Sequence, residues 1–105
     1  MYARNVSMHL KPNTAAEFTK TLERDIVPLL RKHGGFADEL TFLLADGTEA
    51  VAISLWDTKE SADAYNRTGY PEVLKGLSRV LEGTPVVRTY DVSNSTFHKI
   101  PVRSN

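Results

Sequence analysis

The chain has 105 residues, the usual size of a single domain, so we expect one hydrophobic core. Its 13 basic and 13 acidic residues cancel, which gives no broad attraction to nucleic-acid phosphates or anionic lipid. Cysteine is absent, which excludes a disulfide scaffold and a thiolate metal site. No apolar run approaches the roughly 20 residues of a membrane helix, and the first residues lack the apolar segment of a signal peptide. We therefore expect a cytoplasmic protein with neither a nucleic-acid nor a membrane partner.

The chain begins with a strand and a long helix. Residues 5–10 alternate polar and apolar side chains, with Val6, Met8 and Leu10 on the apolar face. Thr14 and Glu17 fit a capping box at a helix start. The helix then carries apolar side chains every three or four residues: Phe18, Leu22, Ile26, Leu29, Leu30 and His33. Pro28 predicts a kink because it lacks a backbone donor, and Gly34-Gly35 predicts the helix end.

A β-hairpin is predicted next. Residues 36–44 form its first strand, Asp46-Gly47 forms a turn that suits a hairpin, and residues 49–56 form its second strand. This second strand is apolar on both faces, one with Val51, Ile53 and Leu55 and the other with Ala50, Ala52, Ser54 and Trp56. An antiparallel strand that faces water should alternate more cleanly. We therefore expect both faces to be covered, the second one by another copy of the sheet.

The sequence pattern of the last part of the chain predicts a broken helix followed by a final strand. The helix starts at residues 57–60, breaks at residues 68–71, and resumes with an apolar stripe that runs to Gly83. Residues 86–92 are predicted as a strand, and Pro85 at its start suits a sheet edge because proline cannot donate to a ladder. The tail that follows carries three apolar residues, Phe97, Ile100 and Val102.

The order strand, helix, strand, strand, helix, strand predicts a ferredoxin-like α+β fold. Right-handed crossovers place both helices on one face of a four-stranded antiparallel sheet. We assign this domain to residues 1–93. We expect the tail, residues 94–105, to pack on the partner of a homodimer.

Two segments resemble the antibiotic biosynthesis monooxygenase domain family. One is Ile-Val-Pro-Leu-Leu-Arg-Lys-His-Gly-Gly-Phe at residues 26–36, and the other is Ile-Ser-Leu-Trp-Asp-Thr-Lys-Glu-Ser-Ala-Asp-Ala-Tyr at residues 53–65. The resemblance implies a dimeric α+β barrel with a pocket between each subunit's sheet and helices. The family includes oxygenases that act on aromatic substrates without metal or flavin, a haem-degrading branch, and quinol-oxidising relatives.

The family's functional residues carry over only in part. Trp56 matches the tryptophan that ends the strand, but Ala52 and Ala62 stand where the aromatic-substrate oxygenases have Asn and Tyr. Val6 replaces the inward Asn of the haem-degrading branch, and Lys75 lies near the place of its His ligand. The resemblance therefore does not imply haem, and we expect no cofactor and no metal.

Trp56 is the most suggestive residue for ligand binding. The small side chains on its strand face leave room under the helices. Trp56 would either form one wall of a slot for a planar ligand or fill that space itself as part of the core. For the pocket that the resemblance implies, we predict that the lining comprises Val6, Met8, Ala52, Ser54, Trp56 and Tyr65.

Tyr65 and Tyr70 flank the helix break, where their phenols could donate to a bound carbonyl or quinone oxygen. They could equally pack their rings inward and leave their hydroxyls in water. Together with Trp56 they are the candidate catalytic residues, and no catalytic base stands out. The three histidines, His9, His33 and His98, show no metal-pair spacing.

Two functions stay open. The first is a cofactor-independent monooxygenase acting on a small aromatic or quinol compound, whose own carbanion would reduce dioxygen. The second is a non-catalytic dimer of the same fold that binds a small hydrophobic ligand or has a structural role. The missing Asn and Tyr favour the second, whereas polar groups that converge on a pocket near Trp56 would favour the first.

Overall fold

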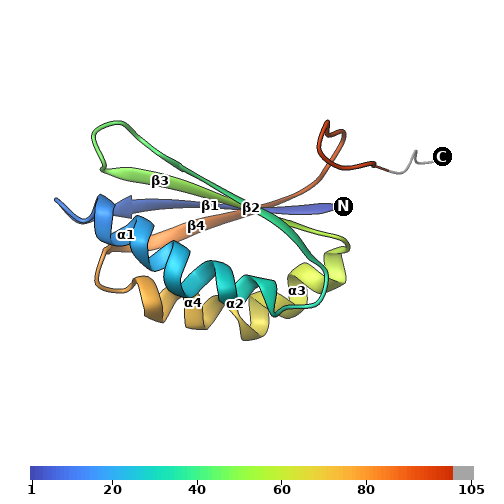
Figure 1. The fold of residues 1–105 in the computed structure, drawn as a ribbon, viewed down its shortest axis with the longest axis horizontal. Helices are drawn as coiled ribbons and strands as arrows, with labels where there is room; N and C mark the ends of the chain where they lie inside the picture. Colours follow the sequence, from blue (N-terminus) through green and yellow to red (C-terminus); the bar gives the residue numbers. More distant parts are fainter. Residues whose placement is uncertain (101–105) are drawn as a thin grey trace.

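The computed structural model describes residues 1–100 as four strands on which a layer of helices is packed. The strands are β1 (Tyr2–Leu10), β2 (Phe36–Leu43), β3 (Glu49–Trp56) and β4 (Leu81–Asp91). The helical segments are α1 (Ala15–Thr21), the π-helical segment η1 (Leu22–Ile26), α2 (Val27–Arg31), α3 (Lys59–Thr68) and α4 (Tyr70–Leu77). All the helices lie on one side of the sheet (Figure 1). The predicted ferredoxin-like α+β fold is confirmed.

The sheet is antiparallel, with the strand order β2-β3-β1-β4. Each strand turns alternate side chains to the helices and to the opposite side, which we call the outer face. Val6 of β1, for example, pairs with Ala52 and Val87 on the helix side, and Asn5 pairs with Ile53 on the outer face. The core therefore lies between the sheet and the helices. Its fully buried members include Phe18, Trp56 and Val80.

The first helix is continuous but irregular around Pro28. Directly before it, the backbone N–H of Val27 donates to the carbonyl of Leu22, five residues back, as in a π-helix. This wider turn accommodates the carbonyl of Arg24, which an ordinary residue at position 28 would have bonded. The structure thus has a π-helical segment directly before the proline at which the sequence predicted a kink. The expected capping box is wrong, because the Thr14 hydroxyl donates to the carbonyl of Lys11, 2.7 Å away, and does not cap the helix.

The second helix divides where its sequence predicted a break, between α3 and α4. Thr58 caps its start, accepting a hydrogen bond of 3.1 Å from the N–H of Ser61. The final strand begins earlier than predicted, at Leu81 instead of residue 86. Leu81 pairs with Leu10, and the ladder then shifts register before Val86. Gly83, with a φ of 75°, lies within this irregular stretch. For this reason the first residues of β4 were predicted as a helix end followed by a turn.

The outer face of the sheet is apolar and largely uncovered. Leu40, Phe42, Val86 and Tyr90 are between 50% and 55% exposed. The neighbouring β3 residues on this face, Val51, Ile53 and Leu55, are only partly buried. The tail leaves β4 on the side away from the helices (Figure 1). There Phe97 lines a shallow hollow with Leu40, Ile53 and Leu55, and His98 contacts Asp38. Val102 lies outside the described residues.

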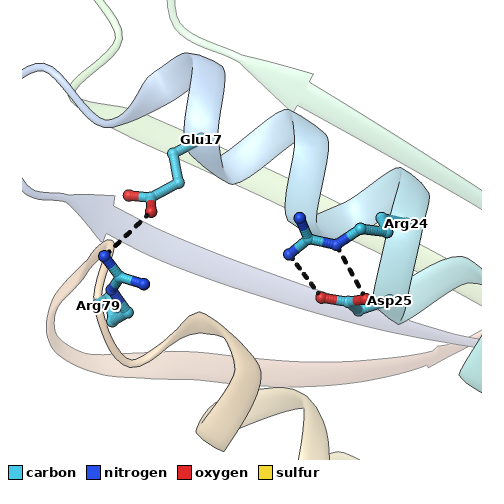
Figure 2. Close-up of polar contacts among 4 residues, drawn as sticks. All are labelled: Glu17, Arg24, Asp25 and Arg79. Atoms are coloured by element: carbon cyan, nitrogen blue, oxygen red, sulfur yellow. Dashed lines mark hydrogen bonds and ion pairs between the residues drawn. The ribbon is translucent and has the colours of Figure 1, made fainter.

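On the helical side of the molecule, exposed side chains form hydrogen bonds and an ion pair (Figure 2). Arg24 donates two hydrogen bonds to Asp25, of 3.1 and 2.9 Å, and Arg79 lies 3.7 Å from the Glu17 carboxylate. Exposed ion pairs of this kind contribute little to the stability of a fold, because water screens both charges. The groove between α1 and α4 that they border is therefore an ordinary solvated surface.

Candidate functional site

A cavity of about 50 Å³ lies between the inner face of the sheet and the helices η1, α2 and α4. Most of its wall is apolar, and the residues that line it on the sheet and helix sides include Val6, Met8, Leu22, Ile26, Leu30, Ala52, Val73, Leu74 and Leu77. Its polar wall groups are Arg4, Glu39, Ser54, Tyr65 and Tyr70. An apolar cavity with a few converging polar groups is the usual form of a small-molecule site.

The sequence-predicted residues gather around this cavity with one exception. Val6, Met8, Ala52, Ser54 and Tyr65 line it, and so does Tyr70 from the start of α4. Trp56 is not among the lining residues. It lies behind Tyr65, fully buried, at the end of the same β3 face.

Trp56 is held in an aromatic cluster. Its ring stacks on Tyr65 with 4.9 Å between ring centroids and 27° between planes, and its Nε1–H donates to the Ser54 hydroxyl at 2.9 Å. Phe36 meets it edge-on, with centroids 5.5 Å apart. Full burial, satisfied hydrogen bonding and aromatic contacts are the features of a core anchor.

His33 completes this cluster from the end of α2. The backbone N–H of His33 donates to the Leu30 carbonyl at 3.0 Å. Since α2 ends at Arg31, His33 lies just after the helix and not in its last turn. Its ring packs edge-on against Tyr65 at 5.3 Å. Gly69 makes this approach possible, because a Cβ there would lie 2.5 Å from His33 Nε2. Tyr65 is therefore fixed from both sides.

Arg4 is the polar group that the cavity most unexpectedly contains. It lies on β1 with only 3% of its surface exposed. Its Nη1 donates to the Asn66 side-chain oxygen at 2.8 Å, while Nε and Nη2 have no hydrogen-bond partner within residues 1–100. The rings of Tyr70 and Tyr65 lie 4.7 and 5.2 Å from its guanidinium carbon. Burial lowers the pKa of Arg4.

The two tyrosines are kept neutral by the same surroundings. Burial raises the pKa of Tyr65 to about 12, although the positive charge of Arg4 opposes the rise. The pKa of Tyr70 is raised for the same reason. At neutral pH both phenols are therefore hydrogen-bond donors that could contact a ligand oxygen.

The polar wall groups follow one row across the sheet. Glu39 on β2 pairs with Ser54 on β3, and Ser54 pairs with Arg4 on β1. All three point toward the helices, and Glu39 also contacts the hydroxyl of Thr41. Since neighbouring strands are about 4.8 Å apart, the backbones of Glu39 and Arg4 lie roughly 10 Å apart across the sheet. No ion pair joins them among the residues described.

Arg4, Glu39 and Asn66 were not among the sequence-predicted site residues. Arg4 has the same parity as Val6, Met8 and Leu10, so the alternation of β1 already placed a charge on the buried face. Glu39 was harder to place, because β2 shifts register between Phe36 and Asp38 and this changes which residues face inward.

Other expected features lie away from the cavity. His9 is exposed and lies 3.5 Å from the Glu49 carboxylate on the rim of the sheet. Lys75 is exposed on α4, 3.9 Å from Glu72, and does not line the cavity. Within residues 1–100, no three His, Asp or Glu side chains are grouped as a metal site would need, and no helix has the length and apolar character to cross a membrane.

Comparison with known proteins gives structural but no sequence matches. No family model and no curated protein matches the chain. A candidate antibiotic biosynthesis monooxygenase from Nitrosomonas europaea is 18% identical, with a TM-score of 0.73 over 90% of this chain and 100% of that one. A monooxygenase from Streptomyces coelicolor in complex with nanaomycin D is 18% identical, with a TM-score of 0.73 over 93% and 92%.

A third solved structure, a cofactor-independent oxygenase from Streptomyces nogalater, is 15% identical, with a TM-score of 0.72 over 90% of this chain and 95% of that one. At such identities the likeness concerns the fold. The resemblance to the antibiotic biosynthesis monooxygenase domain family is therefore confirmed as a shared fold.

Proposed function

We propose that this chain is a monooxygenase-like enzyme that uses no metal, flavin or haem and acts on a small aromatic or quinol compound bound in the cavity. The observation that carries the proposal is the apolar cavity with converging polar groups from β1, β3, α3 and α4. It has the fold of a monooxygenase that was solved with a bound small molecule.

The chemistry asks little of the protein. Loss of a proton from an activated CH₂ group of the substrate gives a carbanion, whose electrons reduce dioxygen and form a C–O bond. Loss of water from the resulting hydroperoxide leaves a carbonyl, so CH₂ and O₂ give C=O and H₂O. The protein supplies a water-poor site and hydrogen-bond donors for the developing oxyanion. Tyr65 and Tyr70, which line the cavity, would act as such donors, and Trp56, which stacks on Tyr65, would orient it.

The cavity must widen to admit a ring. An engineered protein cavity of about 150 Å³ holds benzene, three times the volume present here. Tyr70 is only half-buried and begins α4 directly after the break at Gly69. A shift of this helix start is therefore the expected route of entry.

The experiment is oxygen uptake with quinols and anthrones, measured beside the melting temperature of each mixture. A substrate should raise the melting temperature and consume dioxygen with formation of the oxidised product. Ala52→Leu should abolish both effects, because the larger side chain fills the cavity. The control Ala16→Leu, on the exposed side of α1, should change neither.

The alternative is a non-catalytic ligand-binding protein. It is favoured by Ala52 and Ala62, which stand where the family's aromatic-substrate oxygenases have Asn and Tyr. Ala62 is buried and offers no hydroxyl that could take the place of the missing phenol. A rise in melting temperature without oxygen uptake by any compound would establish this second function.

The proposal includes a homodimer formed through the outer face of the sheet. Four large apolar side chains are half exposed there, and contiguous exposed apolar surface of this kind marks an interaction site. The tail, which runs over the same face, would then lie at the edge of the interface with the partner.

A further inference from the structure

The guanidinium of Arg4 is buried without a counter-ion among the residues that the structure describes. Within residues 1–100 no carboxylate lies at ion-pair distance from it. Asp63, an acid whose charge acts on Arg4, is itself paired with Lys59 at 2.9 Å. The guanidinium has five N–H groups, and within residues 1–100 one hydrogen bond is formed, from Nη1 to Asn66, while Nε and Nη2 have no partner. A buried cation with unpaired donors is costly to maintain.

The surrounding rings explain only part of this arrangement. Tyr65 and Tyr70 present their faces to the cation, and such contacts stabilise a desolvated guanidinium. They accept no conventional hydrogen bonds from Nε or Nη2, however, and the two atoms have no other partner among residues 1–100. A purely structural role would be served as well by an uncharged side chain.

The unpaired donors lie on one edge of the guanidinium. Nε–H and one N–H of Nη2 are parallel in a planar guanidinium, and this pair forms a fork that matches two coplanar oxygens or one anionic oxygen. Asn66 occupies the other end, which fixes the orientation of the fork. Arg4 also lines the cavity, so a group bound there would reach the fork once the atoms that cover Nε and Nη2 are displaced.

We propose that Arg4 binds the ionised oxygen of the ligand, so that the cavity takes a planar aromatic compound in its phenolate, enolate or carboxylate form. This inference rests on the proposed ligand cavity and specifies the charge state of what enters it. An enolate or phenolate held in this way is also the electron-rich form that dioxygen oxidises.

The other titratable groups near the fork agree with this assignment. Tyr65 and Tyr70 face Arg4 as neutral phenols at neutral pH and do not compete as anions. Glu39, the other charged group of the cavity wall, lies two strands away and would repel an anion at its own end. The row from Glu39 to Arg4 therefore orients the ligand with its anionic oxygen toward β1.

Access to the fork requires movement of Tyr70. Nε and Nη2 have no solvent-accessible surface, and the Tyr70 ring, 4.7 Å from the guanidinium carbon, covers them from the half-exposed side. Displacement of this ring would open the fork and widen the cavity at the same time.

The test compares three probes of similar shape: 4-nitrophenol, benzoate and the neutral 4-nitrotoluene. Calorimetry gives their affinities, and the absorbance of bound nitrophenol gives its ionised fraction. We expect the bound nitrophenol to be more ionised than in buffer at the same pH. Arg4→Met should lower the affinity for nitrophenolate and benzoate by about tenfold or more, the usual effect of losing a hydrogen bond to a charged group. The affinity for nitrotoluene should stay unchanged.

The controls separate the possible failures. Arg67→Met removes the same charge from an exposed position on α3 and should affect no probe. If Arg4→Met does not fold, Arg4→Lys keeps the charge without the fork and should still weaken both anions. Unchanged preference for anions over nitrotoluene in the Arg4 variant would overturn this inference alone. Failure of all three probes to bind the wild type would overturn the ligand cavity as well.

Discussion

At the scale of single residues, Trp56 shows how a strand of small side chains becomes a packed wall. Its indole fills the end of the β3 face, stacks on Tyr65 and donates to Ser54. Trp56→Phe should lower the free energy of unfolding by about 1–3 kcal/mol, because it leaves a void and an unpaired hydroxyl. Urea unfolding followed by circular dichroism measures this. A change close to zero would instead mean that the indole borders an open space.

The buried phenol of Tyr65 should make stability fall at high pH. The unfolded chain releases this proton near pH 10.0, whereas the folded protein keeps it to about pH 12. Between these values the unfolded state binds fewer protons, so stability is fully present below pH 10.0 and is lost as pH rises toward 12. The loss from this group is on the order of 2–3 kcal/mol.

Urea unfolding at about pH 9 and about pH 11.5 tests this for the wild type and Tyr65→Phe. The variant should lose clearly less stability than the wild type over this interval, because it lacks the titrating hydroxyl. Equal losses in both proteins would show that Tyr65 does not titrate abnormally.

What the sequence reveals at this scale depends on whether a side chain's neighbours are local. The facing direction of Val6, Met8 and Ser54 follows from strand parity alone. The position of Trp56 behind the cavity wall does not, because it depends on Tyr65, which arrives from a different helix to occupy the intervening space. The sequence also did not reveal that Arg4 has no ion-pair partner within the described part of the chain, because this depends on how distant segments are placed in the fold.

At the scale of elements, the junction between α3 and α4 depends on a residue without a side chain. A Cβ at Gly69 would lie 2.5 Å from His33 Nε2 and 2.6 Å from the Tyr65 ring. Gly69→Ala should therefore lower the melting temperature, with a loss of about 1–3 kcal/mol from overpacking.

A matched control lies in the next helix. Gly76 is exposed near the end of α4, and an added Cβ would meet only Ile26 Cδ1 at an ordinary 3.5 Å. Gly76→Ala should raise stability by up to about 1 kcal/mol through helix propensity. Opposite signs in the two variants identify a packing requirement at Gly69. Stabilisation by both would contradict it.

Element boundaries were predictable where the chain itself supplies a strong local signal. The break between α3 and α4 lies at Gly69, two residues before Pro71. The hairpin turn contains Gly47, whose φ lies in the left-handed region. The start of β4 was not predictable in this way. Val80 and Leu81 continue the apolar spacing of α4, and only pairing of Leu81 with Leu10 on β1, a distant contact, makes Leu81 part of the sheet.

At the scale of the whole molecule, the two faces of the sheet have different partners. The inner face is covered by the helices, and its core residues are almost fully buried. The outer face presents apolar side chains from β2, β3 and β4, with part of the tail over one end. The sequence predicted this surface, because β3 carries apolar residues on both faces. A strand face that is exposed to water normally carries polar residues instead.

The proposed dimer makes the outer face the most sensitive surface to a new charge. A permanent homodimer commonly buries more than about 2,000 Å² in total, so Ile53 in the central strand β3 would lie far from solvent. Ile53→Asp should dissociate the protein or unfold it, because a buried carboxylate without a partner costs several kcal/mol. The control Ala16→Asp, exposed on α1, should stay dimeric. Sedimentation equilibrium at micromolar concentration distinguishes these states, and a wild-type monomer there would rule out the dimer.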